Sequence, residues 1–290
     1  MSKEYETLRV MNNNVILARN LRNEIEVVLM GNGIGFGKKK GQIFKVNVQD
    51  IEKEFVAGEK GLRHSYLELL EAINGEVVAL CTEILAEAEK KLGALSDRSF
   101  IVIVDHISFA IEKLEKGIKI ENPFTFEIQH LYPEEYAIGA YARKRIEEVV
   151  GVDITEDEIG FIALHLSAAK QNVVVSDALK NTRIIKTMID LVEGSLDCDL
   201  RDYPRLYNRL LLHLRGFIQR VDESDFGTEH PLFKMLGTEC KDALKLANKL
   251  KNYVAEQKHV DIPAHEVFYL TLHMDRLIRK REEMTREHNM

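Results

Sequence analysis

The pattern of apolar and polar positions changes character near residue 60. Before it, four short runs rich in β-branched and other apolar residues are separated by polar or glycine-rich turns: 8–11, 15–18, 25–30 and 43–48. Such runs are typical of short strands, so we expect a small antiparallel β-meander. Four short strands bury little apolar surface, which favours dimerisation of this unit.

Beyond residue 60 the apolar positions follow the period of amphipathic helices. An apolar stripe covers residues 66–80, and long helices are expected over 132–150 and 236–253. Pro123 and Pro231 predict equivalent helix starts. The remainder of the chain is therefore expected to be helical.

Two local patterns refine this expectation. Thr155-x-x-Glu158 is typical of a capping box at the start of a helix. Residues 100–104 are mostly β-branched and resemble a strand. We predict a helix there, because their counterpart at 207–212 is plainly helical in pattern.

The helical part contains the same unit twice. Residues 158–166, Glu-Ile-Gly-Phe-Ile-Ala-Leu-His-Leu, match residues 266–274, Glu-Val-Phe-Tyr-Leu-Thr-Leu-His-Met, at an offset of 108 (273 − 165). Asp105-His106 matches Leu212-His213 at an offset of 107 (213 − 106). A unit of this length is a duplicated domain and not a solenoid repeat. We therefore expect a multidomain α+β protein, with a small β domain over 1–60 and all-α helical bundles over 65–170 and 171–282.

Each copy carries two histidines in matching places. His106 and His165 are 59 residues apart (165 − 106), and His213 and His273 are 60 apart (273 − 213). A single histidine on an apolar helix face is more often a core residue, but here two histidines recur at matching positions in both copies. Metal ligand, acid/base catalyst, pH sensor and phosphoryl acceptor all remain as roles.

Phosphoryl acceptance fits the pattern better than the other three. No His-x-x-x-His or His-Glu-x-x-His pair occurs, so we assign no metal and no cofactor. Acid/base catalysis needs one asymmetric site, so we assign no catalytic residue and expect no enzyme. A neutral imidazole offers a nucleophilic nitrogen near pH 7, and a phosphoryl group adds negative charge to the helix face.

Composition and charge favour a cytoplasmic protein with a basic head. The chain is 45% hydrophobic and 30% charged, has three cysteines, and contains no run long enough to insert into a membrane. Its first residues are polar, unlike a signal peptide. Residues 1–58 carry nine Lys/Arg and seven Asp/Glu, a net charge of +2. The remainder therefore carries a net charge of −9, which brings the whole chain to −7. A polyanionic partner would therefore bind the N-terminal unit.

The glycine-rich loop over 31–41 and the turn over 12–14 carry the chemistry of this head. Phe36 offers a flat surface on which a base can stack, and Lys38 to Lys40 can contact phosphates. The amides of Asn12 and Asn14 can pair with base edges. The same residues also fit a plain hairpin loop with a capping Asn turn.

The chain resembles, over essentially its whole length, the bacterial transcriptional antiterminators of the bgl/sac type. The motifs that carry the resemblance are Val10-Met-Asn-Asn-Asn-Val-Ile, Met30-Gly-Asn-Gly-Ile-Gly-Phe-Gly-Lys-Lys, Asp105-His-Ile-Ser-Phe-Ala, Leu131-Tyr-Pro-Glu-Glu-Tyr and Glu158-Ile-Gly-Phe-Ile-Ala-Leu-His. The loop, Asn122-Pro-Phe and Leu131-Tyr-Pro-Glu-Glu-Tyr look most like members that control glucose permease operons.

The resemblance implies a function for each domain. The N-terminal domain would dimerise and bind an mRNA hairpin that overlaps a terminator. Two regulation domains of the sugar phosphotransferase system would receive phosphate from the phosphocarrier HPr and from a sugar permease, enzyme II. The phosphorylation sites would be His106, His165, His213 and His273.

The resemblance also implies RNA contacts. They map onto Arg9, Asn14, Gly31, Asn32, Gly33 and Phe36, to which the residue types add Asn12 and Lys38. Asn32 stands where Arg or Lys is often found, which puts that contact in doubt.

Two rivals from other classes are a metal-dependent phosphohydrolase on a helical bundle and a regulator that binds DNA. Bound metal near His106 would favour the first. The strand-rich head argues against the second.

Overall fold

The computed structural model describes residues 2–13, 15–31, 33–51, 53–56, 73–96, 98–226 and 239–288. The chain divides into two compact units, Met1–Ala178 and Leu179–Met290. Among the described residues, no helix is long and apolar enough to cross a membrane.

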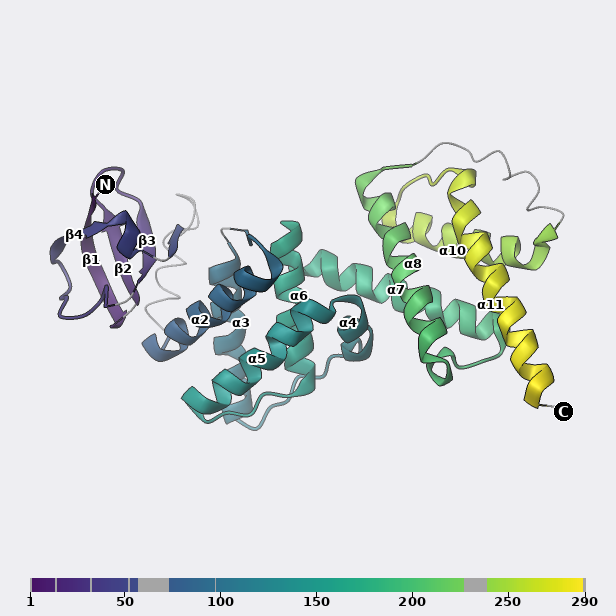
Figure 1. The fold of residues 1–290 in the computed structure, drawn as a ribbon, viewed down its shortest axis with the longest axis horizontal. Coiled ribbons are helices and arrows are strands. Elements are labelled where there is room, and N and C mark those ends of the chain that lie inside the picture. The colour runs from purple at the N-terminus through teal and green to yellow at the C-terminus, as the bar shows by residue number, and fades with distance from the viewer. Residues whose placement is uncertain are drawn as a thin grey trace. The chain divides into compact units, whose positions relative to one another are not determined.

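The first unit begins with a five-stranded antiparallel sheet, coloured purple in Figure 1. Its strands are β1 (Ser2–Asn12), β2 (Val15–Asn20), β3 (Glu26–Met30), β4 (Ile43–Asn47) and β5 (Lys53–Val56), in the order β4-β1-β2-β3-β5. The four predicted strands are present, and β5 was not predicted. The predicted meander order is wrong, because β4 pairs with β1 and β5 takes its place beside β3.

The loop between β3 and β4 explains this order. Ile34, in the middle of the loop, is buried in the same core as Tyr5, Ile16 and Leu29. Beyond it, Gly41 donates a backbone hydrogen bond to the carbonyl of Thr7 over 2.7 Å. The buried side chain of Ile34 and the hydrogen bond from Gly41 thus hold the loop against β1, so that β4 starts beside β1.

The helices of the first unit are α2 (Gly75–Leu92), α3 (Ser99–Glu115), α4 (Thr125–Leu131), α5 (Pro133–Val150) and α6 (Glu156–Gln171). Helix α7 (Val175–Leu196) begins in the first unit and continues in the second. The second unit also contains α8 (Pro204–Glu223), α10 (Lys241–Lys258) and α11 (Val267–His288). Short 3-10 turns are η1 (Val48–Asp50), η2 (Leu200–Asp202) and η3 (Ala264–Glu266).

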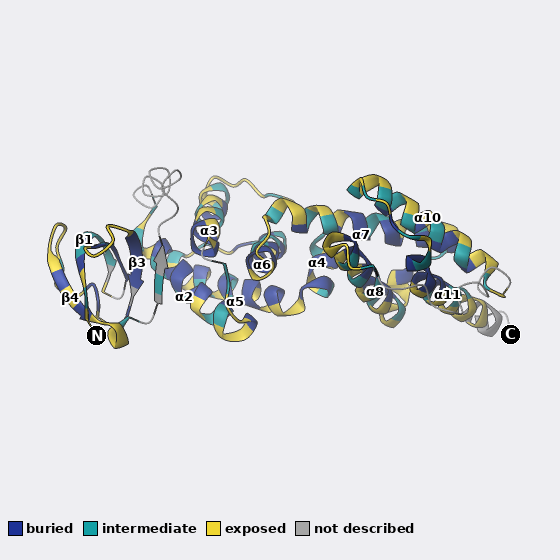
Figure 2. Ribbon diagram, turned by 90° about the horizontal axis from the view of Figure 1, so that it is seen from above, coloured by how far each residue is buried: buried dark blue, intermediate teal, exposed yellow. Residues whose placement is uncertain are grey.

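The packing follows the amphipathic pattern. In the first unit α3 packs against α2 and α6, and α5 packs against α2, α4 and α6. In the second unit α11 packs against α8 and α10. Figure 2 shows buried and exposed residues alternating along these helices, as one apolar face per helix requires.

Most of the helix predictions are confirmed. The helix predicted over 132–150 is α5 (Pro133–Val150), and the strand-like residues 100–104 lie inside α3. The apolar face of α3 therefore outweighs its β-branched composition, because packing contributes more than intrinsic propensity. Residues 66–72 of the predicted stripe lie outside the described residues, and α2 begins at Gly75.

One predicted helix start is wrong, and a second lies outside the described residues. Helix α4 begins at Thr125 and not at Pro123, because Asn122 first forms a turn in which its side chain accepts the Phe124 N–H over 3.1 Å. Pro231 and residues 236–238 lie outside the described residues, and α10 begins at Lys241.

Candidate functional sites: two histidine pairs and a basic groove

The first histidine pair lies where α3 packs against α6. His106 comes from α3 and His165 from α6, and their ring centroids are 4.5 Å apart. Both side chains are partly buried, and Phe161 lies edge-on to His106 at 6.0 Å. Residues that are 59 positions apart (165 − 106) are thus brought into contact.

A buried carboxylate completes this first site. Nε2 of His106 lies 3.3 Å from Oε2 of Glu158, which is 1% exposed. The hydroxyl of Thr155 accepts the backbone N–H of Glu158 over 3.3 Å, so the predicted cap at the start of α6 is confirmed. The Glu158 side chain faces the histidine on α3, however, and its Oε2 makes no hydrogen bond within the described residues.

His165 is held in its neutral form. Burial, together with a smaller contribution from the neighbouring His106, lowers the pKa of His165 to about 3. Nδ1 of His165 is buried with no hydrogen-bond partner in the described part of the chain. An unprotonated imidazole nitrogen without a partner is what a phosphoryl acceptor needs.

The second pair repeats this geometry at the contact of α8 with α11. The rings of His213 and His273 are stacked, with centroids 3.3 Å apart and an interplanar angle of 20°. Burial lowers the pKa of His213, and Arg209 adds to that effect. Burial also lowers the pKa of His273, to about 4, with further contributions from His213, Arg209 and Arg276.

The equivalent carboxylate in the second site pairs with an arginine and not with a histidine. Glu266 is the repeat equivalent of Glu158 (266 − 108), and its Oε2 lies 3.2 Å from Nε of Arg220. The pocket beside the stacked rings is lined instead by two arginines, Arg209 and Arg276, and by leucines 206, 210 and 277. The first pair therefore faces a negative group and the second faces positive ones.

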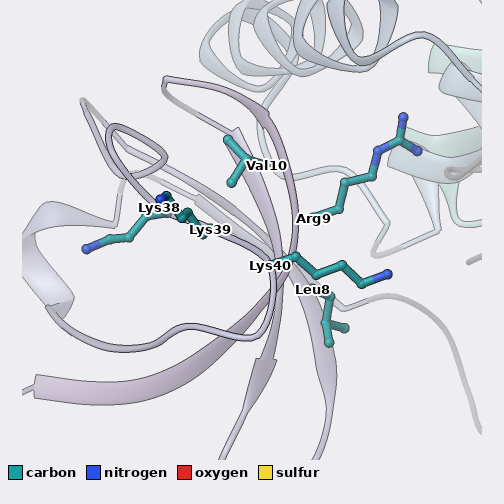
Figure 3. A pocket seen from close by; sticks show the side chains of 6 residues that line it. All are labelled: Leu8, Arg9, Val10, Lys38, Lys39 and Lys40. Carbon is teal, nitrogen blue, oxygen red and sulfur yellow. The ribbon is translucent and has the colours of Figure 1, made fainter.

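A basic groove on the sheet forms the third site. Its lining residues come from β1 and from the end of the glycine-rich loop: Leu8, Arg9, Val10, Lys38, Lys39 and Lys40 (Figure 3). The pairing of β1 with β2 is irregular between Thr7 and Arg9 and again between Val10 and Asn12. Such bulges redirect side chains from the regular alternation, which places Leu8, Arg9 and Val10 along one groove.

The structure brings the predicted Asn turn and glycine-rich loop together. The N–H of Gly35 donates to the carbonyl of Asn13 over 2.8 Å. Gly33 has a φ of +69°, and its carbonyl accepts the N–H of Phe36 over 3.0 Å, which forms the tight turn that presents Phe36. The Phe36 ring is 72% exposed, although a ring with no ligand is normally buried.

The remaining predicted RNA contacts are only partly described. Gly31 is buried and its carbonyl accepts the N–H of Ile34 over 3.1 Å. Asn14 and Asn32 lie outside the described residues, as does the side chain of Asn12. Their predicted roles stay predictions.

Lysines 38 and 40 point to different sides of the loop. Figure 3 shows the side chains of Arg9 and Lys40 extending to one side and that of Lys38 to the other. The Lys38 ammonium lies 4.9 Å from the centroid of the Phe44 ring, a cation–π contact. Lys40 therefore joins Arg9 as a cation of the groove, a pairing that was missed because its position depends on the loop conformation.

Comparison with known protein families shows to which family the chain belongs. A family model described as the CAT RNA binding domain matches residues 5–62. A second model, the PRD domain, matches residues 82–169 and 186–277, more than half of the chain. The chain therefore belongs to the family of transcriptional antiterminators that join a CAT RNA-binding domain to two PRD domains.

Individual relatives agree with this family. The chain is 32% identical to the beta-glucoside operon antiterminator of Dickeya chrysanthemi, over 96% of this chain and 99% of that protein. It is 30% identical to the transcription antiterminator LicT of Bacillus subtilis, over 94% and 98%. It is also 30% identical to the protein GlcT of Staphylococcus haemolyticus, over 93% and 95%.

A solved structure of GlcT CAT-PRDI is 34% identical, covers 58% of this chain and 99% of that one, and has a TM-score of 0.49. The sequence identities to the β-glucoside and GlcT relatives are almost equal. The expected likeness to glucose-operon members therefore stays a prediction, as do the exact domain boundaries.

Proposed function

We propose that this protein binds a hairpin in nascent mRNA and prevents transcription termination, and that phosphate on its paired histidines sets its activity. The observation that carries the proposal is the recurrence of a partly buried histidine pair at the equivalent helix contact in both repeats. One such pair is explained by packing alone. Two pairs, in a chain whose family combines RNA binding with PRD domains, indicate a regulatory modification.

The surroundings of the histidines support a protein as phosphate donor. Val102 and Phe109 are exposed on α3, at four residues before and three residues after His106. Tyr269, four residues before His273 on α11, is 57% exposed. Exposed apolar side chains beside a nucleophile mark a surface on which another protein can dock. The donors would be the phosphocarrier HPr and the enzyme II of a sugar permease.

The basic groove supports the RNA-binding half of the proposal. Arg9 and Lys40 supply two positive charges to neutralise phosphates, and the exposed ring of Phe36 supplies a stacking surface for an unpaired base. The RNA contacts would be Arg9, Asn12, Asn14, Gly31, Asn32, Gly33, Phe36, Lys38 and Lys40. Acting on nascent mRNA, the protein would work in the cytoplasm and have no catalytic role.

The active form would be a homodimer. Strand β4 is at the edge of the sheet, its Ile43 is 62% exposed, and Val48, directly after the strand, is also exposed. An edge strand with exposed apolar residues pairs readily with a second copy. Phosphate on the regulation domains would shift the arrangement of the two copies, because charges at a two-fold interface meet their own copies.

The test is to identify the RNA that the full chain binds in cells. Crosslinking the chain to RNA and sequencing the bound fragments should enrich a hairpin that overlaps a terminator upstream of a sugar permease gene. The enrichment should be lost in a variant with Arg9→Gln and Phe36→Ala. Enrichment of unstructured RNA, or equal recovery with the variant, would contradict the proposal. The family and its relatives do not favour the phosphohydrolase alternative.

A further inference from the structure

Two arginines converge on the second histidine pair from different helices. Arg209 lies four residues before His213 on α8, and Arg276 lies three residues after His273 on α11. Residues at these spacings share a helix face, and both arginines line the pocket beside the stacked rings. Neither forms an ion pair with any described residue, although nearby Asp275 does so with Arg279.

Two arginines without an ion pair among the described residues, beside two partly buried rings, need an explanation. Arg209 contributes to lowering the pKa of both rings, and Arg276 contributes to lowering that of His273. Nε2 of His213 is buried and makes no hydrogen bond within the described residues. Positive groups beside imidazoles oppose protonation of the rings, so the arginines do not stabilise a charged form of the unmodified pair. Their positions suit the binding of an anion, such as a phosphoryl group on one of the rings.

The first pair has no equivalent of this arrangement. At the repeat-equivalent positions it carries Val102 (209 − 107) and Ala168 (276 − 108). Ala168 is buried, so no long side chain fits there. The first pair faces Glu158 at 3.3 Å. The two sites therefore share their histidines and differ in the charge that surrounds them.

Building on the function proposed above, we propose that Arg209 and Arg276 form a two-arginine clamp that binds the phosphoryl group carried by the His213–His273 pair. The ring centroids are 3.3 Å apart, which leaves no room for a phosphoryl group between the rings. The group must therefore project into the pocket that the two arginines line. Guanidinium groups bind phosphate oxygens through paired, charge-assisted hydrogen bonds. The clamp then joins α8 to α11 through the phosphate.

The chemical step needs no other component than a phosphoramide donor. The lone pair of the neutral imidazole nitrogen forms the new P–N bond while the donor P–N bond breaks. The donor nitrogen leaves with that electron pair. The proton on the second ring nitrogen stays on the ring or passes to water.

The experiment uses the full chain and a small phosphoryl donor, potassium phosphoramidate, which releases ammonia and requires no protein docking. Phosphorus NMR follows the ionisation of each phosphohistidine with pH, and His213→Ala and His273→Ala assign the signals of the second pair. In the wild type, the clamp should hold the phosphoryl dianion so that its ionisation midpoint lies below that of the first pair. In a variant with Arg209→Gln and Arg276→Gln, the midpoint should rise by about one pH unit, a tenfold change.

Two further variants make the result specific. Arg209→Lys with Arg276→Lys keeps the charges without the planar fork and should give an intermediate midpoint, which also carries the test if the glutamine variant fails to fold. Arg215→Gln removes a charge from the same helix outside the pocket and should leave the midpoint unchanged.

The proposal is overturned if the glutamine variant titrates like the wild type, if Arg215→Gln shifts the midpoint equally, or if phosphoramidate labels the first pair and never the second. Failure of the proposed function is distinguishable. In that case phosphorylated HPr leaves the wild type unlabelled while the phosphoramidate titration still shows the clamp.

Discussion

Nε2 of His106 lies 3.3 Å from Oε2 of Glu158, whereas the equivalent Glu266 is paired with Arg220. A phosphoryl group on the first pair would therefore meet an uncompensated buried carboxylate. Like charges at such a distance repel strongly where water is excluded. Phosphate on the first pair should loosen the contact of α3 with α6, and phosphate on the second pair should strengthen that of α8 with α11.

We predict opposite effects of charge at the two sites in an antitermination reporter. His106→Asp, which places a carboxylate beside Glu158, should inhibit antitermination, and His165→Asp should act in the same direction. His213→Asp or His273→Asp should activate or have no effect, since arginines 209 and 276 face the new charge. Constitutive activity of His106→Asp, or identical behaviour of both domains, would contradict this prediction.

The same reasoning predicts a compensating change. Glu158→Gln keeps the volume of the side chain and removes its charge, so the double variant His106→Asp with Glu158→Gln should recover part of the reporter activity. The matched control is Glu158→Gln with His213→Asp, in which the new carboxylate lies in the second repeat and Glu158→Gln should leave the reporter activity unchanged. An equal gain of activity in both combinations would show that Glu158 acts on general stability and not on the charge of the first pair.

Phosphate should appear on the repeat-matched histidines and on no others. Incubation of the full chain with phosphorylated HPr should give acid-labile phosphate on His106, His165, His213 and His273, because these rings are paired at helix contacts. His64, His130 and His259 have no equivalent in the other copy and serve as internal controls. Peptide mapping of the label checks this, and label confined to His64 or His130 would refute it.

The basic groove predicts which cations contact RNA. Arg9→Gln and Lys40→Gln should each weaken hairpin binding and lower the slope of log affinity against log salt by about 1, as expected for one phosphate contact. Lys45→Gln is the matched control, since Lys45 lies on β4 in an ion pair with Glu4. Binding measured at several salt concentrations tests this, and an unchanged slope for Lys40→Gln would exclude Lys40 from the interface.

The exposed aromatic ring predicts a separate, salt-independent loss. Phe36→Ala should cost about 1–3 kcal/mol of RNA-binding free energy if a base stacks on the ring. Leu21→Ala removes another exposed apolar side chain of the same domain, outside the groove and the β4 edge, and should leave the affinity for RNA unchanged. An unchanged affinity in Phe36→Ala combined with Asn14→Ala would rule out the assigned contact surface.

The lowered pKa of His165 predicts loss of stability in acid. The pKa of His165 is about 3 in the folded chain against an ordinary 6.5, so the unfolded chain binds the proton more tightly. Stability should therefore be lost as the pH falls from about 6.5 toward 3. His165→Gln should show a shallower fall of the unfolding midpoint over this window than the wild type. Parallel curves would show that His165 does not titrate in this way.

The sequence by itself determined the type of most elements and the equivalence of the histidines. Apolar periodicity is a local property of the chain, so residues 132–150 were predicted as the helix that became α5. The composition of residues 100–104 suggested a strand, but their alignment with the helical pattern of the second repeat correctly predicted a helix. Strand positions were predicted in the same way, but the predicted strand order was wrong, because pairing depends on where the loop between β3 and β4 leads.

Only the tertiary structure decided which side chains meet. The contact of two helices depends on their rotation and crossing, which the sequence spacing does not specify. Hence His106 meets His165 across 59 residues, Glu158 turns to the histidine on α3 and not back to its own helix start, and arginines from α8 and α11 converge on one pocket. Lys40 likewise joins Arg9 only through the backbone bond between Gly41 and Thr7, which holds the loop against β1.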